Sequence, residues 1–358
     1  MVPERSVFCH DKFGRLLKTS LLKALDAVAY PAACFVGAAL ARGPQRGTVE
    51  TLIIRPGGMG DLICADMALT ELGCDSRDFT WLIETRSRPW ADYRKLPYLC
   101  YDAGPWRTLW KIRRRYGRVI NMEQFFGLSQ AYALAARGRR GRLVSFATNR
   151  AAHWGDAVVE YDWRNQHETV EFARLLAEGL HLPRAGTPRH PRSRLRAASA
   201  PPLVLVAGQQ SRSRCLALED WVRLISEWRH GRSLLVAASP QDQAFAGQLQ
   251  AGLGGAVERF EGSFTDLCEQ IACSEEVFTL DGGAVHMASW FGVPTTAIFT
   301  SGREQKWYPL GEGSRLLRRE DLPCQPCTKF GQVPSCPHGY ACLRIGGYVP
   351  LKPSPYFR

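Results

Sequence analysis

A glycine turn in the second half of the chain has the residues of a diphosphate site. The stretch FTLDGGAVHMASWFG, 278–292, reads as a strand ending at Asp281, a turn at Gly282 and Gly283, and a helix from Ala284. Backbone amides at a glycine-bared helix N-terminus bind anions. His286, in the first helical turn, could add a hydrogen bond or a charge. The alternative is an ordinary glycine turn beside a surface histidine.

A second glycine turn carries a carboxylate. TLIIRPGGMGDL, 51–62, reads as a buried strand, a turn over Gly58, Met59 and Gly60, and a helix start. Asp61 stands where a phosphate-binding loop would offer an amide or a lysine. The turn therefore has the shape of a phosphate site, but the negative charge of Asp61 would repel a phosphate. A helix cap is the plain reading of Asp61.

Four cysteines near the C-terminus have metal-ligand spacing. Four thiols within nineteen residues, interleaved with Pro and Gly, fit a closed, structural zinc or iron site; they are Cys324, Cys327, Cys336 and Cys342. His338 could replace one of them. Unliganded thiols or two disulfides remain the alternatives.

The elements that must position these residues form two similar halves. Strands alternate with helices over about 49–182 and again over 203–300, with amphipathic HETVEFARLLAEGL (167–180) and LEDWVRLISEW (218–228) among the helices. This predicts two open, doubly wound parallel sheets. Ligands of such sheets bind at the carboxyl ends of the strands. We expect an N-terminal helical segment at 1–47, a Rossmann-like domain at 48–190 and a Pro- and Arg-rich linker at 191–202. A second such domain follows at 203–322, with a Cys-rich tail at 323–358 that returns toward the first domain.

Charge and composition indicate an anionic partner. The chain has 358 residues, a net charge of +12 and a 45% hydrophobic content, ordinary for two folded domains. Scattered unpaired thiols favour a reducing compartment, hence the cytoplasm. Residues 24–41 are mostly apolar and flanked by Lys and Arg. This favours a helix on a membrane surface, or one docked on its own domain, over a spanning helix, because Asp26 and Pro31 interrupt the run.

Both glycine turns match one family. Asp281 to His286 followed by MASWFGVPTTAIF resembles the donor-site signature of the heptosyltransferase-type family of glycosyltransferases, family nine. Gly57 to Asp61 with Ala68-Leu69 is similar to that family's first turn. VINMEQFFGLSQ, RLVSF and HETVEFARLLAEGL are further landmarks. The resemblance covers roughly 49–345 and is weak at 85–115 and 183–202. Gly282 departs from the family, which has Thr there.

The resemblance implies roles for individual residues. Asp61 would be the catalytic base that takes the proton of an acceptor hydroxyl. Arg214, where the family usually has Lys, would contact the donor diphosphate with Asp281, Gly282, Gly283, Ala284 and His286. Asp242 would hold the ribose where relatives carry Glu. No catalytic divalent metal is expected, and the fold would be GT-B, two facing Rossmann-like domains.

We therefore expect an inverting glycosyltransferase. The implied donor is a nucleotide diphosphate sugar, ADP-heptose by resemblance, and the implied acceptor an anionic glycolipid such as a lipopolysaccharide core. The enzyme would be peripheral on the inner face of a bacterial inner membrane. A protein acceptor is the alternative. A metal-dependent nucleic-acid-binding protein would explain the charge but not the glycine turns, so no nucleic-acid partner is expected. A nicotinamide dehydrogenase is weaker again, because the first turn lacks Gly-x-Gly-x-x-Gly.

Overall fold

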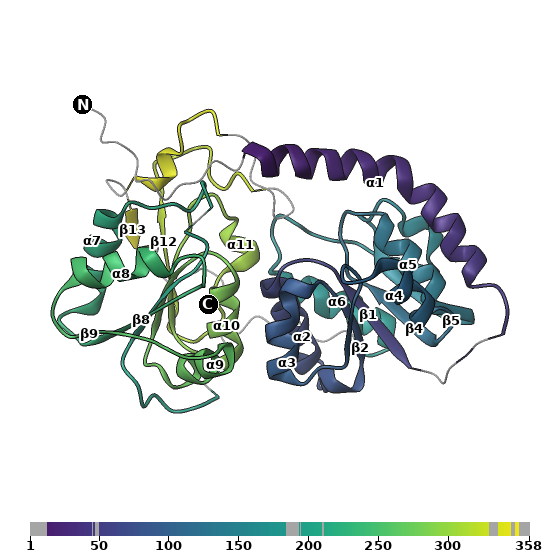
Figure 1. Cartoon of the computed structure of the whole chain (residues 1–358), viewed down its shortest axis with the longest axis horizontal. Helices are drawn as coiled ribbons and strands as arrows, with labels where there is room; N and C mark the ends of the chain where they lie inside the picture. Colours follow the sequence, from purple (N-terminus) through teal and green to yellow (C-terminus); the bar gives the residue numbers. More distant parts are fainter. Residues whose placement is uncertain are drawn as a thin grey trace. The chain divides into compact units, whose positions relative to one another are not determined.

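The computed structural model describes residues 13–44, 46, 50–183, 193, 195–209, 211–328, 336–344 and 348–350, with the side chains of 13–22, 139 and 348–350 left out. From Gly14 on, the chain divides into two compact units, whose described residues fall within Gly14–Pro188 and within Arg189–Arg358. We call them the N-terminal and the C-terminal unit and describe each by itself (Figure 1).

The N-terminal unit is built on a parallel sheet in the order β3-β2-β1-β4-β5-β6. All five residues of the central strand β1 are buried, as expected for a strand covered by helices on both faces. The strands are β1 (Thr51–Arg55), β2 (Thr80–Ile83), β3 (Tyr98–Cys100), β4 (Tyr116–Asn121), β5 (Arg137–Phe146) and β6 (Ala157–Val159). The helices after α1 are α2 (Met59–Glu71), α3 (Arg88–Arg94), α4 (Pro105–Ile112), α5 (Leu128–Ala136) and α6 (Glu168–Leu180).

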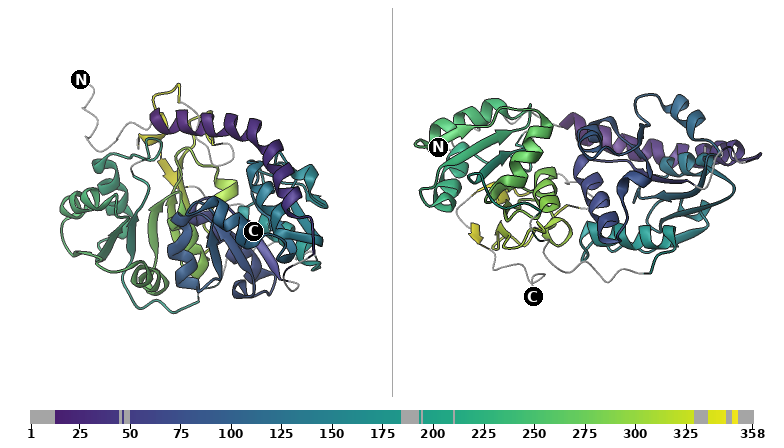
Figure 2. Two further views of the ribbon diagram at one scale, coloured as in Figure 1. Left: turned by 45° about the vertical axis from the view of Figure 1, so that its right-hand side comes forward. Right: turned by 90° about the horizontal axis from the view of Figure 1, so that it is seen from below.

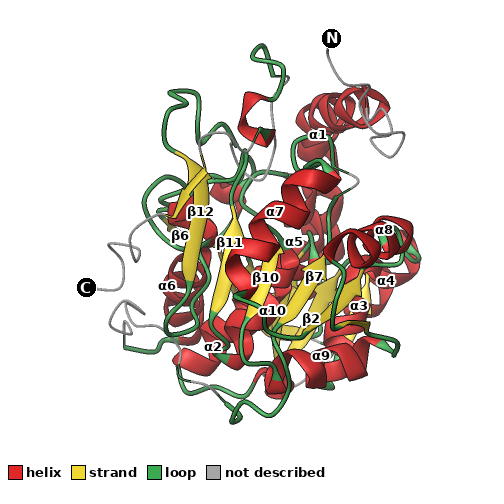
Figure 3. Ribbon diagram, turned by 90° about the vertical axis from the view of Figure 1, so that its left-hand side faces the viewer, coloured by secondary structure: helices red, strands yellow, loops and turns green. Residues whose placement is uncertain are grey.

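The C-terminal unit repeats this plan with the order β13-β12-β11-β10-β7-β8-β9. Figure 3 shows β12, β11, β10 and β7 side by side. All pairs are parallel except β12 with β13, the strand that the tail adds. The strands are β7 (Leu203–Val206), β8 (Leu234–Ala238), β9 (Val257–Arg259), β10 (Val277–Leu280), β11 (Thr295–Ile298), β12 (Arg315–Arg319) and β13 (Tyr348–Pro350). The helices are α7 (Leu218–Arg229), α8 (Gln243–Leu253), α9 (Phe264–Cys273), α10 (Gly283–Phe291) and α11 (Glu304–Trp307).

Helix α1 (Phe13–Leu40), the dark purple helix in Figures 1 and 2, packs on α5 of the N-terminal unit. The buried carboxylate of Asp26 accepts hydrogen bonds from the amides of Gly127 and Leu128, at 3.0 and 2.9 Å, and so caps α5. Gly37 lies so close to α5 that a Cβ there would meet the Ala131 carbonyl oxygen at 2.4 Å. Docking on its own domain, one of the two placements expected for this helix, is therefore observed, and the placement on a membrane surface stays a prediction.

The predicted fold class of two α/β sheets is confirmed, and so are the long elements predicted at 51–55, 167–180, 218–228 and 284–292. Short strands went unpredicted, among them β3, β6 and β9, because three residues are too few to show a period-two pattern. The predicted linker is described from 193 and 195 onward. There Leu195 and Ala200 donate backbone hydrogen bonds to Phe291 and Cys273, so this stretch packs on the C-terminal unit.

Candidate active site

The first half-site is the turn between β1 and α2. Gly57 has a φ of +132°, and a Cβ there would meet Asp61 Oδ2 at 3.0 Å, so both conformation and space favour glycine. Asp61, the third residue of α2, accepts a hydrogen bond at Oδ2 from the Gly58 amide at 3.2 Å. The helix-cap reading of Asp61 is thus correct as geometry. The carboxylate can still accept a further hydrogen bond or a proton, because the residue remains accessible and each oxygen has a second lone pair.

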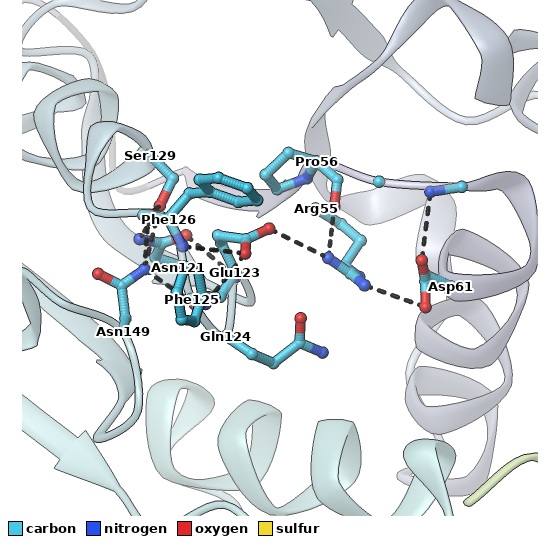
Figure 4. A network of polar contacts seen from close by, with 12 residues as sticks. Arg55, Pro56, Asp61, Asn121, Glu123, Gln124, Phe125, Phe126, Ser129 and Asn149 are labelled. Atoms are coloured by element: carbon cyan, nitrogen blue, oxygen red, sulfur yellow. Dashed lines mark hydrogen bonds and ion pairs between the residues drawn. The ribbon is translucent and has the colours of Figure 1, made fainter. Parts of the chain in front are cut away.

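A buried arginine holds the other oxygen of Asp61. Arg55, the last residue of β1, lies 3.1 Å by Nη2 from Asp61 Oδ1; its side chain is 4% exposed and that of Asp61 32% (Figure 4). Its Nη1 lies 3.7 Å from Glu123 Oε2 and donates to the Pro56 carbonyl. Burial alone would lower the pKa of Arg55, but the charges of Asp61, Glu123 and Glu168 outweigh that effect and raise it. Arg55 is therefore a permanent cation that orients Asp61.

Glu123 closes the other side of this group. It follows β4, and its Oε1 accepts hydrogen bonds from the amides of Phe125 and Phe126 at 3.0 and 3.2 Å (Figure 4). Burial raises the pKa of Glu123, against the opposing effect of Arg55. The neighbouring strands β1 and β4 thus bring an arginine and two carboxylates to one edge of the sheet. Only Asp61 of the two carboxylates is accessible enough to meet a substrate hydroxyl.

The second half-site lies on β7 and β10, which are neighbours in the C-terminal sheet. Asp281, directly after β10, is 2% exposed, and its Oδ1 accepts a hydrogen bond from Arg214 Nε at 2.8 Å. Burial raises the pKa of Asp281, and the Arg214 charge opposes that rise. Cβ atoms built on Gly208 and Gly282 would lie 3.7 and 3.8 Å from Arg214 Nη1. Arg214 is thus anchored through its Nε between two glycine turns. A third of its side-chain surface remains exposed.

The glycine turn after β10 leads into α10 as the sequence predicts. Gly282 has a φ of +154° and precedes the first helical residue, Gly283; both are partly exposed. The amides of this first turn are those that could bind a phosphate. Ala284 and His286 are 5% and 4% exposed, so His286 lies under the turn rather than on the surface. Its contact with a phosphate stays a prediction.

Asp242 holds the two loops of this edge together. Its Oδ2 accepts hydrogen bonds from the Gly208 amide at 3.0 Å and from Ser239 Oγ at 2.6 Å. Asp242 is 1% exposed, and its Oδ1 has no hydrogen-bond partner in the described part of the chain. The carboxylate fixes the turn that faces Arg214, a role the sequence did not predict. Its predicted contact with a ribose stays a prediction.

The four cysteines of the tail gather near this half-site. Burial, followed by the other three thiols, raises the pKa of Cys342 to about 12. Cys327 Sγ lies 3.9 Å from the Ser301 carbonyl oxygen, and the Tyr340 amide donates to Cys336 Sγ at 3.3 Å. Across the described residues, no three His, Cys, Asp or Glu side chains are arranged to share one ion. The metal, and the return of the tail toward the first domain, stay predictions.

Two residues of this geometry escaped the sequence analysis. Arg55 is a charge at the end of an otherwise apolar strand, and Glu123 stands at the carboxyl end of another. Charged residues directly after buried parallel strands are a signal for ligand-binding edges. IIRPGG and VINMEQ both carry that signal.

Comparison with known proteins identifies the fold. No family model and no curated protein matches the chain. Among solved structures, Escherichia coli heptosyltransferase WaaC with ADP matches with a TM-score of 0.58 at 17% identity, over 75% of this chain and 92% of that one. The E. coli ADP-heptose lipopolysaccharide heptosyltransferase II matches with a TM-score of 0.57 at 16% identity, over 76% of this chain and 92% of that one. A family 9 glycosyltransferase from Veillonella parvula matches with a TM-score of 0.59 at 12% identity, over 75% of this chain and 86% of that one.

The two sheets and these matches define an α/β fold of the GT-B class. More closely, it is the heptosyltransferase-like fold of glycosyltransferase family 9, as the glycine turns predicted.

Proposed function

We propose that this chain is an inverting glycosyltransferase that moves a sugar from a nucleotide diphosphate donor to an acceptor hydroxyl. The observation that carries the proposal is the anchored Arg214 between the turns at Gly208 and Gly282. Its Nε is occupied by Asp281, which leaves the Nη groups for a second anion. A guanidinium beside free helix amides suits a diphosphate. The fold shared with an ADP-bound heptosyltransferase supports this reading.

The reaction needs one base and one anion-stabilising group. The acceptor oxygen would form a bond to the anomeric carbon as the bond from that carbon to the diphosphate breaks. Asp61 would take the hydroxyl proton. Arg214 and the amides of Gly283 and Ala284 would stabilise the leaving diphosphate. Each half of this chemistry uses residues of one unit, so each can be tested by itself.

Heptose is the proposed sugar and ADP the proposed nucleotide. The two named heptosyltransferases among the structural matches support this choice. An anionic glycolipid such as a lipopolysaccharide core is the proposed acceptor, since a net charge of +12 favours such a substrate. The proposed place of the enzyme is the cytoplasmic face of a bacterial inner membrane.

A structural zinc or iron ion is proposed for Cys324, Cys327, Cys336 and Cys342. Burial and the nearby thiols raise the pKa of Cys327 and of Cys342, and the Tyr340 amide donates to Cys336 Sγ, so these sulfurs lie near one another. Four thiols are a donor set that suits such an ion. The bound ion would stabilise the fold of the tail. The tail packs where Thr328 donates its amide hydrogen bond to the Ser301 carbonyl, 3.1 Å away.

The test is a transfer assay with defined substrates. The full chain is incubated with ADP-heptose and a lipopolysaccharide core that lacks heptose, and ADP release and acceptor mass are followed together. We expect both to increase in step. UDP-N-acetylglucosamine is the donor control, and a surface protein is the alternative acceptor. ADP-heptose that is never transferred to any acceptor, while another nucleotide sugar is, would contradict the donor assignment.

A further inference from the structure

The outward face of α1 is apolar. Nine positions of this helix between residues 24 and 39 are exposed, and every one is apolar: Ala24, Leu25, Ala27, Val28, Ala29, Ala32, Phe35, Val36 and Ala39. The single charged residue of that stretch, Asp26, points inward and is 1% exposed. A helix on a water-exposed surface normally shows the reverse pattern. Lys23–Leu40 is also long and apolar enough to cross a membrane, and 17% of it is buried.

Helix α4 continues this apolar face. Trp106 and Trp110, one helical turn apart, are 78% and 59% exposed. Together with Leu109 they line a groove of about 560 Å³ against Val36 and Leu40 of α1. The two helices therefore share one exposed apolar surface within the N-terminal unit. Two neighbouring, largely exposed tryptophans are typical of side chains at the headgroup level of a bilayer.

Basic side chains surround this surface. Residues 23–46 and 105–115 contain eight basic residues and one acidic residue, the buried Asp26. Arg114 Nη1 donates to the Arg42 carbonyl at 2.7 Å, which joins the end of α1 to the loop after α4. Partial burial and the charges of Arg46 and Arg114 lower the pKa of Arg113. Within the described part of the chain, no carboxylate pairs with any of these four arginines, so their charge is available to an anionic partner.

We propose that the outer face of α1 and the Trp106–Trp110 face of α4 form one docking surface for a membrane that contains anionic lipid. The apolar side chains enter the interfacial layer and the arginines contact lipid phosphates. α1 lies along the membrane and does not cross it, because withdrawing Asp26 would leave the Gly127 and Leu128 amides without their cap. The surface includes α4 as well as α1. The proposal does not depend on the transferase reaction, because membrane binding can be measured whether or not that reaction takes place.

The test is co-sedimentation of the full chain with vesicles of phosphatidylcholine, alone or mixed with phosphatidylglycerol. We expect binding to the mixed vesicles that weakens as salt is added. Val28→Glu on α1 and Trp106→Glu on α4 should each reduce the partition coefficient at least about tenfold, through lost apolar contact and added repulsion. Val158→Glu is the matched control, since Val158 is 52% exposed on β6 of the same unit.

Three results would overturn the proposal. The first is equal binding of the Trp106→Glu variant and the unchanged chain, which would restrict the surface to α1. The second is equal binding to both kinds of vesicle, which would remove the role of anionic lipid. The third is a dimer that Val28→Glu dissociates, without vesicle binding, which would assign the surface to a second copy of the chain. Circular dichroism and sedimentation velocity of each variant exclude misfolding and report the dimer.

Discussion

Removing the Arg55 charge should destabilise the N-terminal unit and misplace its candidate base. Arg55→Met keeps the length of the side chain and leaves Asp61 and Glu123 without their cation. Breaking a buried ion pair by removing one partner costs about 3–5 kcal/mol. The Asp61 side chain is 32% exposed and water screens it, and Glu123 keeps two amide hydrogen bonds. We therefore expect the lower end, about 3 kcal/mol.

Urea unfolding monitored by circular dichroism measures this loss. Glu123→Gln is the matched partner: in the double variant with Arg55→Met, part of the loss should be recovered, since one uncompensated buried carboxylate is gone. Arg55→Lys should lose less, because the charge remains. An Arg55→Met chain as stable as the unchanged chain would refute the assignment of Arg55 as a charge-compensating anchor. If the loss of stability in the double variant equals the sum of the losses in the two single variants, the coupling of Arg55 to Glu123 is refuted.

Three further predictions concern the other sites. Arg214→Ala should weaken ADP binding by about 2 kcal/mol, or roughly thirtyfold, the scale of a charge-assisted hydrogen bond, and His286→Ala should weaken it less; calorimetry that finds ADP affinity unchanged in both would put the donor elsewhere. Cys327→Ser should lose about one equivalent of zinc or iron per chain and melt at lower temperature, whereas metal-free protein of full stability would contradict the metal site. The pKa values of Cys34 and Cys268 are raised to about 12 from an ordinary 9.0, in each case first by burial. The protonated thiols therefore contribute their full stabilisation below pH 9, and that contribution is lost as the pH rises from 9 to 12. Urea midpoints that do not decrease between pH 9 and pH 12 would contradict this prediction.

The parts of the fold that the sequence predicted are those with a local signal. β1 is an unbroken apolar run that ends in a glycine turn, and α6 has apolar residues at helical spacing through all its turns. Both appear where expected. The glycine turns at Gly57 and Gly282 were equally visible, because each needs a positive φ.

The unpredicted features depend on contacts between distant segments. The Asp26 carboxylate finds its partners, the Gly127 and Leu128 amides, about a hundred residues further on. Hydropathy alone therefore could not show that this helix docks on its own domain. The pairing of Arg55 with Glu123 likewise requires β1 and β4 to be neighbours in the sheet. Knowledge of the strand order would have been needed first.

The double turn at the second half-site shows the same limit. The sequence predicted the Gly282 turn and, by resemblance, a role for Arg214. It did not predict that Asp281 would hold the Nε of Arg214, or that Asp242 would fix the Gly208 turn beside it. Those contacts link β7, β8 and β10, three strands spread over about eighty residues of chain.

The central claim is that Asp61 is a base and not only a helix cap. Asp61→Asn keeps the size of the side chain and a carbonyl oxygen that can accept the Gly58 amide. It removes the group that takes the proton. The decisive measurement is the sugar-transfer rate of this variant at saturating donor, beside its ADP affinity and its urea midpoint. The account predicts a fall of at least about a hundredfold in rate, with ADP affinity unchanged. A variant that transfers sugar at nearly the original rate would contradict it.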